Sequence, residues 1–200
     1  MEPLGPRLPS LHRVTRLLGP RATEALAREA FVRHADAQIS LVGDEGAAPP
    51  HDPLRWFETA GGGPALRAFY TAPAVLGALR VVTGVAWRPS GEDGTYSYYR
   101  HEGHFLGIHL DVDDCKLALI TCFHEEGAPS DGQSGALELW PERLGEPLAA
   151  IEADPEPGRL TVRLRPGESI VLLGGRAPHR FTPTGQGHVR ITAPLCYLPA

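Results

Sequence analysis

The stretch FLGIHLD, residues 105–111, decides how this chain is interpreted, because it joins a strand-like pattern to two side chains that bind metals. Successive side chains of a β-strand point to opposite faces, so His109 and Asp111 would lie on the same side of one strand and could share one ion. A His-x-Asp pair alone is a weak signal in a chain with 9 histidines. Its meaning depends on the segments that follow it.

A second histidine, His179, comes much later, after an apolar run over 168–173 that ends in two glycines. Two imidazoles and one carboxylate are the donor set of the 2-His-1-carboxylate facial triad, which binds non-haem Fe(II) and leaves coordination positions open. The sequence therefore predicts a metal site with His109, Asp111 and His179 as ligands. Asp113 has the same strand parity but would lie about 13 Å from His109, so Asp111 is favoured.

Arg190 and Thr192 follow on the last expected strand, where they share one face. Arg190 stands among apolar neighbours, and a buried guanidinium needs a partner of opposite charge. Its planar fork pairs bidentately with carboxylates. A carboxylate of a bound ligand or an acidic side chain of the protein would meet this need, and the sequence leaves both open.

Taken in order, these segments resemble the Fe(II)/2-oxoglutarate-dependent oxygenases, and within them the prolyl-hydroxylase-like branch. The resemblance covers about residues 75–200, and its most specific part is the ordered set rather than any one motif. The matching segments are 99–105, 109–111, 116–123, 134–142, 166–173, 178–180 and 190–192. The resemblance implies a double-stranded β-helix, or jelly roll, with Fe(II) at its mouth and with 2-oxoglutarate and O2 as cosubstrates.

The resemblance also implies which residues surround the cosubstrate. Arg190 would bind the C5 carboxylate of 2-oxoglutarate, with Thr192 assisting, and Tyr99 would hydrogen-bond the same group. Leu137 and Thr121 match positions that line the cosubstrate.

The implied reaction is the oxidation of an unactivated C–H bond, with release of succinate and CO2. Halogenating relatives lack the ligand carboxylate, so Asp111 favours hydroxylation, although desaturation or ring closure uses the same ligands. Phe123 stands where some relatives carry a second tyrosine, which removes one hydroxyl from the expected cosubstrate site. We expect the substrate to be a small metabolite or an amino-acid-derived natural product.

Two other classes remain open. A cupin-like metalloenzyme that does not use 2-oxoglutarate, either a dioxygenase or an isomerase, is the alternative function, although the tight His-x-His cluster typical of cupins is absent. A non-catalytic small-molecule binder on the same barrel is the third. Succinate production coupled to loss of 2-oxoglutarate separates the first class from both others.

The expected architecture is mainly β with N-terminal helices: a cupin-like jelly roll flanked by helices, in a single domain of residues 1–200. Residues 1–83 would form a mainly helical support and residues 84–200 the jelly-roll core. Helical segments are expected at 11–18, 23–33, 54–57, 64–70 and 73–82, and a loop at 43–53. Strands are expected at 95–101, 105–111, 116–123, 136–140, 160–165, 168–173, 179–182 and 189–197.

The charge and the apolar runs of the chain argue against two classes of partner, nucleic acids and membranes. A net charge of -5 argues against nucleic acid, which normally requires a basic patch. We expect no membrane partner, because no run approaches the length of about 18–20 apolar residues that a bilayer requires.

The three cysteines, Cys115, Cys122 and Cys196, have no CxxC spacing and predict reduced thiols in a cytoplasmic protein. The single lysine and abundant alanine, glycine and proline suggest a high-GC bacterial genome and fit secondary metabolism. Oligomeric state is left open.

Overall fold

A computed structural model describes residues 13–43, 52–130 and 132–200. The helices are α1 (Pro20–Arg33), α2 (Pro64–Tyr70), α3 (Pro73–Thr83) and α4 (Leu148–Ala153), with a 3-10 turn at His34–Asp36. The strands are β1 (Arg13–Arg16), β2 (Gln38–Val42), β3 (Arg55–Gly61), β4 (Trp87–Pro89), β5 (Thr95–Tyr99), β6 (Phe105–His109), β7 (Leu117–Glu126), β8 (Leu137–Leu139), β9 (Leu160–Val162), β10 (Glu168–Leu172), β11 (His179–Phe181) and β12 (Val189–Pro199).

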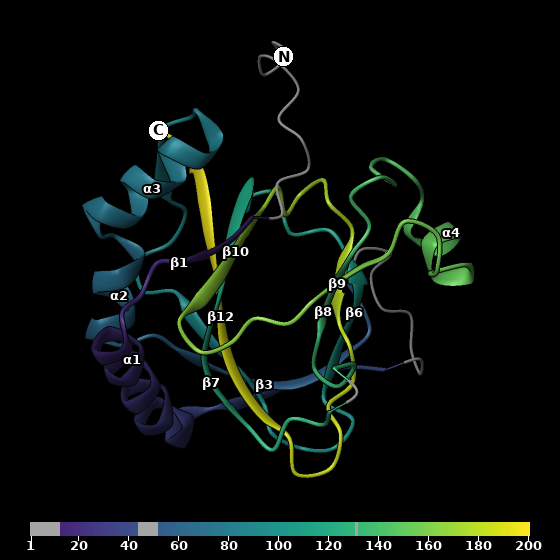
Figure 1. Ribbon diagram of the computed structural model, residues 1–200, viewed down its shortest axis with the longest axis horizontal. Helices are drawn as coiled ribbons and strands as arrows, with labels where there is room; N and C mark the ends of the chain where they lie inside the picture. The colour runs from purple at the N-terminus through teal and green to yellow at the C-terminus, as the bar shows by residue number, and fades with distance from the viewer. Residues whose placement is uncertain (1–12, 44–51, 131) are drawn as a thin grey trace.

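These strands form one antiparallel sheet that curls around an interior (Figure 1). The order is β1-β10-β7-β12-β5-β3-β6-β11-β8-β9, with β2 beside β3 and β4 beside β12. The sheet turns between β3 and β6, so β6, β8, β9 and β11 face the β10–β7–β12 side (Figure 1). The predicted mainly-β jelly roll is confirmed.

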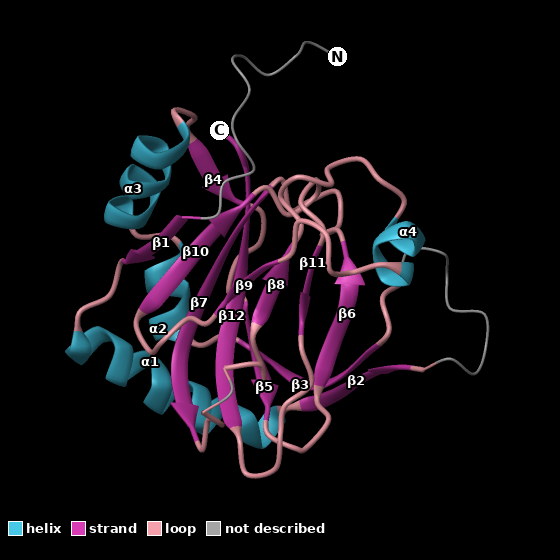
Figure 2. Cartoon of the chain, turned by 45° about the vertical axis from the view of Figure 1, so that its right-hand side comes forward, coloured by secondary structure: helices cyan, strands magenta, loops and turns pink. Residues whose placement is uncertain are grey.

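The two faces of the sheet bury two different cores. In β7, Leu117 and Leu119 pack outward against the helices, whereas Ala118 and Ile120 point into the barrel. Figure 2 shows α1, α2 and α3 together on the β10–β7 side and α4 beside β6. The inner core contains Ile120 together with residues of the opposing strands β8 and β11. Inward side chains from the two sides of the barrel therefore pack against each other.

All eight strands expected after residue 84 are present, with ends displaced by a few residues, and α1, α2 and α3 lie where helices were expected. Two other helical predictions are wrong. The stretch at 54–57 belongs to the strand β3, and the described part of 11–18 contains the strand β1. Short apolar runs do not distinguish a helix from a buried strand, and here pairing with distant strands decides. The expected loop at 43–53 lies mostly outside the described residues.

The N-terminal region is therefore more than a helical support. It contributes β1 to one edge of the sheet, next to β10, and β3 to the centre, between β5 and β6. The neighbouring strand β2 was not predicted. The turn of the sheet that closes the barrel thus depends on β3, which comes from the first third of the chain.

The expectation that no stretch could cross a bilayer needs a correction at Pro64–Thr83. Within the described residues, this stretch is long and apolar enough by length and composition. The structure divides it at Thr71 and Ala72 into α2 and α3, which place Leu66 and Leu79 in the outer core.

The cysteines also differ from expectation. Cys115 and Cys196 form a disulfide, and Cys122 is a buried free thiol. The prediction of reduced thiols is therefore wrong for two of the three. Local spacing could not reveal the bond, because 81 residues separate the two cysteines and β12 must pair with β7 before they meet. Disulfides persist mainly in oxidising compartments, so the cysteines no longer support a cytoplasmic location. That location stays a prediction.

Candidate metal centre

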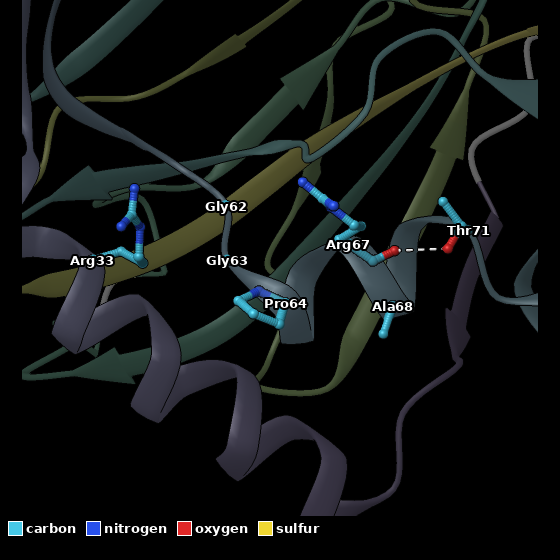
Figure 3. A pocket seen from close by; sticks show the side chains of 7 residues that line it. All are labelled: Arg33, Gly62, Gly63, Pro64, Arg67, Ala68 and Thr71. Atoms are coloured by element: carbon cyan, nitrogen blue, oxygen red, sulfur yellow. Dashed lines mark hydrogen bonds between the residues drawn. The ribbon is translucent and has the colours of Figure 1, made fainter.

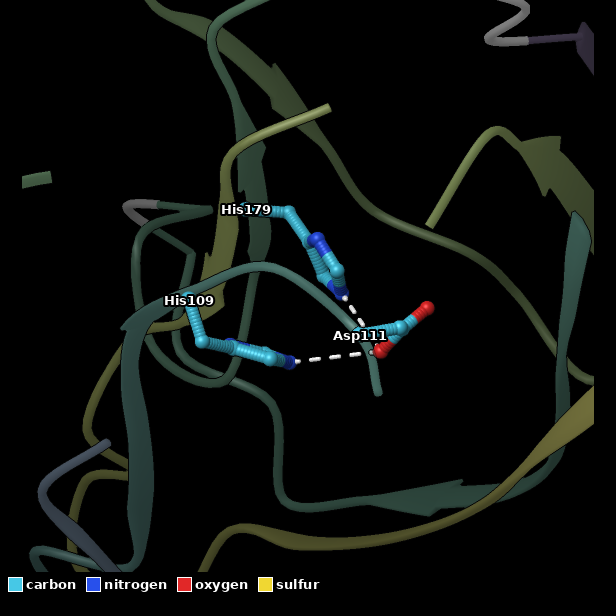
Figure 4. A group of neighbouring side chains, drawn as sticks. All are labelled: His109, Asp111 and His179. Carbon is cyan, nitrogen blue, oxygen red and sulfur yellow. Dashed lines mark ion pairs between the residues drawn. The ribbon is translucent and has the colours of Figure 1, made fainter. Parts of the chain in front are cut away.

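His109 and His179 are directly opposite each other on two neighbouring strands, His109 at the end of β6 and His179 at the start of β11. Their ring centroids are 4.1 Å apart. Asp111 follows just after β6, and its backbone N–H donates to the carbonyl oxygen of Gly174 at 2.9 Å. One ligand atom from each of His109, Asp111 and His179 lies within 4.8 Å of the others. Figure 4 shows the three side chains pointing toward one another.

Both imidazoles are oriented by the backbone. Nδ1 of His109 lies 2.9 Å from the carbonyl oxygen of Gly107, and Nδ1 of His179 lies 2.9 Å from that of Ala177. A carbonyl oxygen only accepts, so each Nδ1 carries a proton, and Nε2 is the ring nitrogen of each histidine that can bind a metal. This is the arrangement that orients histidines as metal ligands.

The carboxylate of Asp111 lies between the two Nε2 atoms. Its Oδ1 is 3.6 Å from each of them, and its buried Oδ2 has no hydrogen-bond partner among the described residues. Burial opposes ionisation, but hydrogen bonding to His109 and His179 outweighs it and holds the pKa of Asp111 well below its usual value. An ionised carboxylate with an unpartnered buried oxygen fits a cation at this place.

Two further observations agree with a metal. Burial and the neighbouring His179 lower the pKa of His109, which favours the neutral imidazole that binds metals, whereas burial of His179 is outweighed by Asp111, which raises the pKa of His179. Gly174 lies so close to Asp111 that a Cβ at that position would stand 1.7 Å from Oδ2. Only glycine at position 174 leaves room for the carboxylate of Asp111.

Arg190 lies on the inner face of β12 and is fully buried. Its Nη1 donates to Oε1 of Glu125 at 2.8 Å, whereas Nε and Nη2 have no hydrogen-bond partner in the part of the chain that the structure describes. Nε and Nη2 together form an edge that binds a carboxylate bidentately. The residue thus pairs with an acid of the protein and still presents one edge that fits an anionic ligand.

Phe181 connects this arginine to the metal cluster. It lies two residues after His179 on the same face of β11, a step of about 6–7 Å along the strand. The guanidinium carbon of Arg190 is 6.0 Å from the centroid of the Phe181 ring. Tyr99 is the cross-strand partner of Arg190, and its ring centroid is 5.2 Å from that of Phe181. The arginine, the tyrosine and His179 therefore lie on the same inner face of the barrel.

No protein-family model matches the sequence, and no curated protein sequence matches it. Solved structures do match. SnoK, a non-haem α-ketoglutarate (2-oxoglutarate) dependent carbocyclase from nogalamycin biosynthesis, superposes with a TM-score of 0.73 at 14% identity, over 96% of this chain and 81% of SnoK. The epimerase SnoN, in complex with Fe3+, α-ketoglutarate and nogalamycin RO, gives 0.72 at 14% identity, over 96% of this chain and 80% of SnoN.

A prolyl-4-hydroxylase from Pseudomonas putida gives a TM-score of 0.58 at 19% identity and covers 92% of each chain. The chain has the Fe(II)/2-oxoglutarate oxygenase fold. The likeness extends over nearly the whole chain, including the N-terminal helices and strands.

Within this oxygenase fold, four of the five residues predicted to surround the cosubstrate share the inner face. Arg190, Tyr99, Leu137 and Thr192 are all buried there. Burial raises the pKa of Tyr99, so its hydroxyl stays protonated and can donate a hydrogen bond.

The fifth residue, Thr121, lies on the other face of the sheet. It alternates with Leu119 and Phe123, which pack against the helices, and its Oγ1 is 2.8 Å from Oγ of Ser169. The structure therefore places Thr121 away from the inner face that carries Arg190 and Tyr99. Phe123 also points outward, so its lack of a hydroxyl does not bear on the interior.

Three residues around Arg190 were not recognised from the sequence: Glu125, Arg163 and His188. Nη2 of Arg163 and Nε2 of His188 lie 3.2 Å and 3.4 Å from the same Oε1 of Glu125 that Arg190 contacts. Each of the three stands near the end of a strand, where charged residues are usually exposed to solvent. The apolar setting of Arg190 signalled that a partner was needed but not which acid supplies it.

Two other residues of types that bind metals, Asp113 and the neighbouring histidine His104, lie apart from the cluster. The side chain of Asp113 is fully exposed and pairs with Lys116 at 3.1 Å. His104 is buried against Trp56, with ring centroids 4.7 Å apart. Neither belongs to the group that could hold a metal among the described residues.

A separate hollow lies outside the barrel beside α2 (Figure 3). It has a volume of about 470 Å³ and is lined by Arg33, Gly62, Gly63, Pro64, Arg67, Ala68 and Thr71. Its arginines already pair with acids, Arg33 with Asp36 and Arg67 with Asp93. It contains no residue of the metal cluster.

Proposed function

We propose that this protein is an Fe(II)- and 2-oxoglutarate-dependent oxygenase that oxidises a C–H bond of a small molecule. The observation that carries the proposal is the cluster of His109, Asp111 and His179, with both Nε2 atoms and an ionised carboxylate within 4.8 Å of one another. Two imidazoles and one carboxylate are the donor set for non-haem Fe(II), and they leave positions for the cosubstrates.

The unpartnered edge of Arg190 supports 2-oxoglutarate as the cosubstrate. Nε and Nη2 are buried, charged and lack hydrogen-bond partners within the described chain, and a carboxylate satisfies both. Tyr99, directly opposite, can donate to the same group. Bound Fe(II) and 2-oxoglutarate would supply the oxidising chemistry, with succinate and CO2 as the products of the cosubstrate. The protein's contribution is to hold the cosubstrate at one end through Arg190, in the buried interior of the barrel where water is excluded.

A small natural product is the substrate class that we favour. SnoK and SnoN come from nogalamycin biosynthesis, and the SnoN complex holds nogalamycin RO. Two exposed apolar residues, Leu110 and Val112, flank the ligand Asp111 and offer an apolar rim beside the metal. We propose hydroxylation as the outcome, because halogenating relatives lack the carboxylate that Asp111 supplies here. SnoK is a carbocyclase and SnoN an epimerase, so ring closure and epimerisation are the competing outcomes.

The test is turnover of the cosubstrate. Purified protein is loaded anaerobically with Fe(II), mixed with 2-oxoglutarate and O2, and assayed for succinate, alone and with candidate small molecules. We expect Fe(II)- and O2-dependent succinate that rises when a substrate is present.

His179→Ala is the matched variant, because it removes one ligand. It should lose bound iron and succinate formation together. Normal iron content in this variant, or turnover without 2-oxoglutarate, would contradict the proposal and favour a cupin-like enzyme or another metal site.

A further inference from the structure

Glu125 is a buried acid that the proposed chemistry does not use. One oxygen, Oε1, contacts Nη1 of Arg190 at 2.8 Å, Nη2 of Arg163 at 3.2 Å and Nε2 of His188 at 3.4 Å. Its side chain is 11% exposed, and that of Arg190 is 0% exposed. Glu125 therefore lies at the centre of the charged cluster behind the arginine.

An irregularity of β7 brings Glu125 to this position. On the side facing β12, Cys122 pairs with Thr192 and His124 pairs with Ile191, so Phe123 is an extra residue. Phe123 and His124 both point outward, Phe123 against Phe69 and His124 against Phe31. Such a β-bulge reverses the alternation of the residues after it. Without it, Glu125 would face the helices; with it, Glu125 stands directly opposite Arg190.

The contact leaves one edge of the guanidinium free. Nη1 is held by Glu125, and only Nε and Nη2 lack partners among the described residues. A hydrogen bond at Nη1 restricts how the guanidinium can turn and so fixes the direction of its Nε/Nη2 edge. The cluster also contains two guanidinium groups and one carboxylate, so a second carboxylate would balance it.

We propose that Glu125 is a positioning residue that holds Arg190 so that its Nε/Nη2 edge faces the distal carboxylate of the cosubstrate. This inference rests on the proposed use of 2-oxoglutarate. Glu125 touches neither the metal cluster nor the cosubstrate edge of Arg190 and acts through the arginine alone.

Three variants separate geometry from charge. Glu125→Ala removes both the acceptor and the charge. Glu125→Gln keeps an oxygen that accepts from Nη1 and removes only the charge. Glu126→Ala is the matched control, because Glu126 is the next residue on β7 and its side chain is 76% exposed.

Two readouts are compared: KM for 2-oxoglutarate against kcat, and the dissociation constant of 2-oxoglutarate by calorimetry with Ni2+ replacing Fe(II), where no turnover occurs. We expect Glu125→Ala to raise both KM and the dissociation constant at least tenfold, with kcat at saturation and metal content within twofold of the unmodified protein. Glu125→Gln should recover most of the affinity, and Glu126→Ala should match the unmodified protein.

An alanine variant that binds 2-oxoglutarate normally would overturn the positioning role, as would a glutamine variant no better than alanine. Tighter binding in Glu125→Gln would also overturn it, since the carboxylate would then be competing with the cosubstrate for Arg190. If Glu125→Ala does not fold, Glu125→Asp replaces it, because it withdraws the carboxylate by one methylene and should weaken binding likewise.

If the proposed use of 2-oxoglutarate is wrong, the experiment gives a different result. Unmodified protein that neither turns over nor binds 2-oxoglutarate contradicts the cosubstrate itself. Unmodified protein that uses 2-oxoglutarate, with an unaffected alanine variant, contradicts only the role of Glu125.

Discussion

Both histidines of the candidate metal centre are oriented by the same local device, a hydrogen bond from Nδ1 to the carbonyl oxygen two residues earlier. The orientation therefore depends on the backbone of each strand rather than on other side chains. Asp111 differs, because it lies beyond the end of β6 and is held by its backbone contact with Gly174. The carboxylate is thus the proposed ligand whose position depends on a loop.

Asp111 and Asp113 give a paired test of the ligand set. Asp111→Gly should keep both imidazoles, lose part of the iron affinity and largely stop product formation, because one position on the metal is vacated and a negative charge is lost. Asp113→Gly should keep most activity, because Asp113 lies at the surface beside Lys116. Product formation is measured for both at saturating Fe(II) and 2-oxoglutarate. An active Asp111→Gly beside an inactive Asp113→Gly would show that the ligand assignment is wrong.

The role of Arg190 is tested by replacing its guanidinium group. Arg190→Leu should raise KM for 2-oxoglutarate sharply while iron stays bound, because losing a charge-assisted bidentate pair costs roughly 2–5 kcal/mol. Arg190→Lys should recover only part, since an ammonium group cannot reproduce the planar edge. Initial rates across 2-oxoglutarate concentrations and the iron content provide the measurement. Unchanged KM in Arg190→Leu would place the carboxylate anchor elsewhere.

At the scale of elements, the strands of the second half follow from the sequence because glycine and proline punctuate them and apolar residues fill them. The N-terminal strands β1, β2 and β3 do not, because distant pairing rather than local pattern makes them strands. The alternation rule found the shared face of Arg190 and Thr192 correctly. It could not find Glu125, because the bulge at Phe123 reverses the alternation in β7. The resemblance placed Thr121 near the cosubstrate, but its parity with Leu119 turns it outward.

The disulfide between Cys115 and Cys196 ties the loop after Asp111 to β12. Cys115→Ser should lower the free energy of unfolding by about 2–5 kcal/mol, because the cross-link restricts the unfolded chain. Urea unfolding with and without a reductant measures this. Reduced unmodified protein should match the variant, and the reductant should not change the variant further. Equal stability of the oxidised protein and Cys115→Ser would mean that the bond does not stabilise the fold.

For the whole molecule, the buried charge cluster predicts a dependence of stability on pH. Burial opposes the ionisation of Glu125, but His188, Arg190 and Arg163 outweigh it and lower its pKa from 4.5 to about 2. The stabilisation is therefore fully present above about pH 4.5 and is lost as the pH falls toward 2, a change of about 3 kcal/mol.

The measurement is the free energy of unfolding of metal-free protein between pH 7 and pH 2.5, for unmodified protein and Glu125→Gln. The advantage of the unmodified protein should shrink across the acidic part of this range. A difference that stays constant with pH would contradict a depressed pKa at Glu125.

The pairing of His109 with His179 has a consequence for how the proposed oxygenase would acquire its metal. During synthesis the first two ligands leave the ribosome about 70 residues before the third, at a stage when β11 does not yet exist. Contacts between such distant segments form late, after the long intervening loop has closed. A nascent chain therefore offers at most a His-Asp pair, which binds iron poorly, and the three-ligand site arises only when β11 pairs with β6. Iron retention would then report that this last closure is complete, and metal loading becomes a step that follows folding rather than one that guides it.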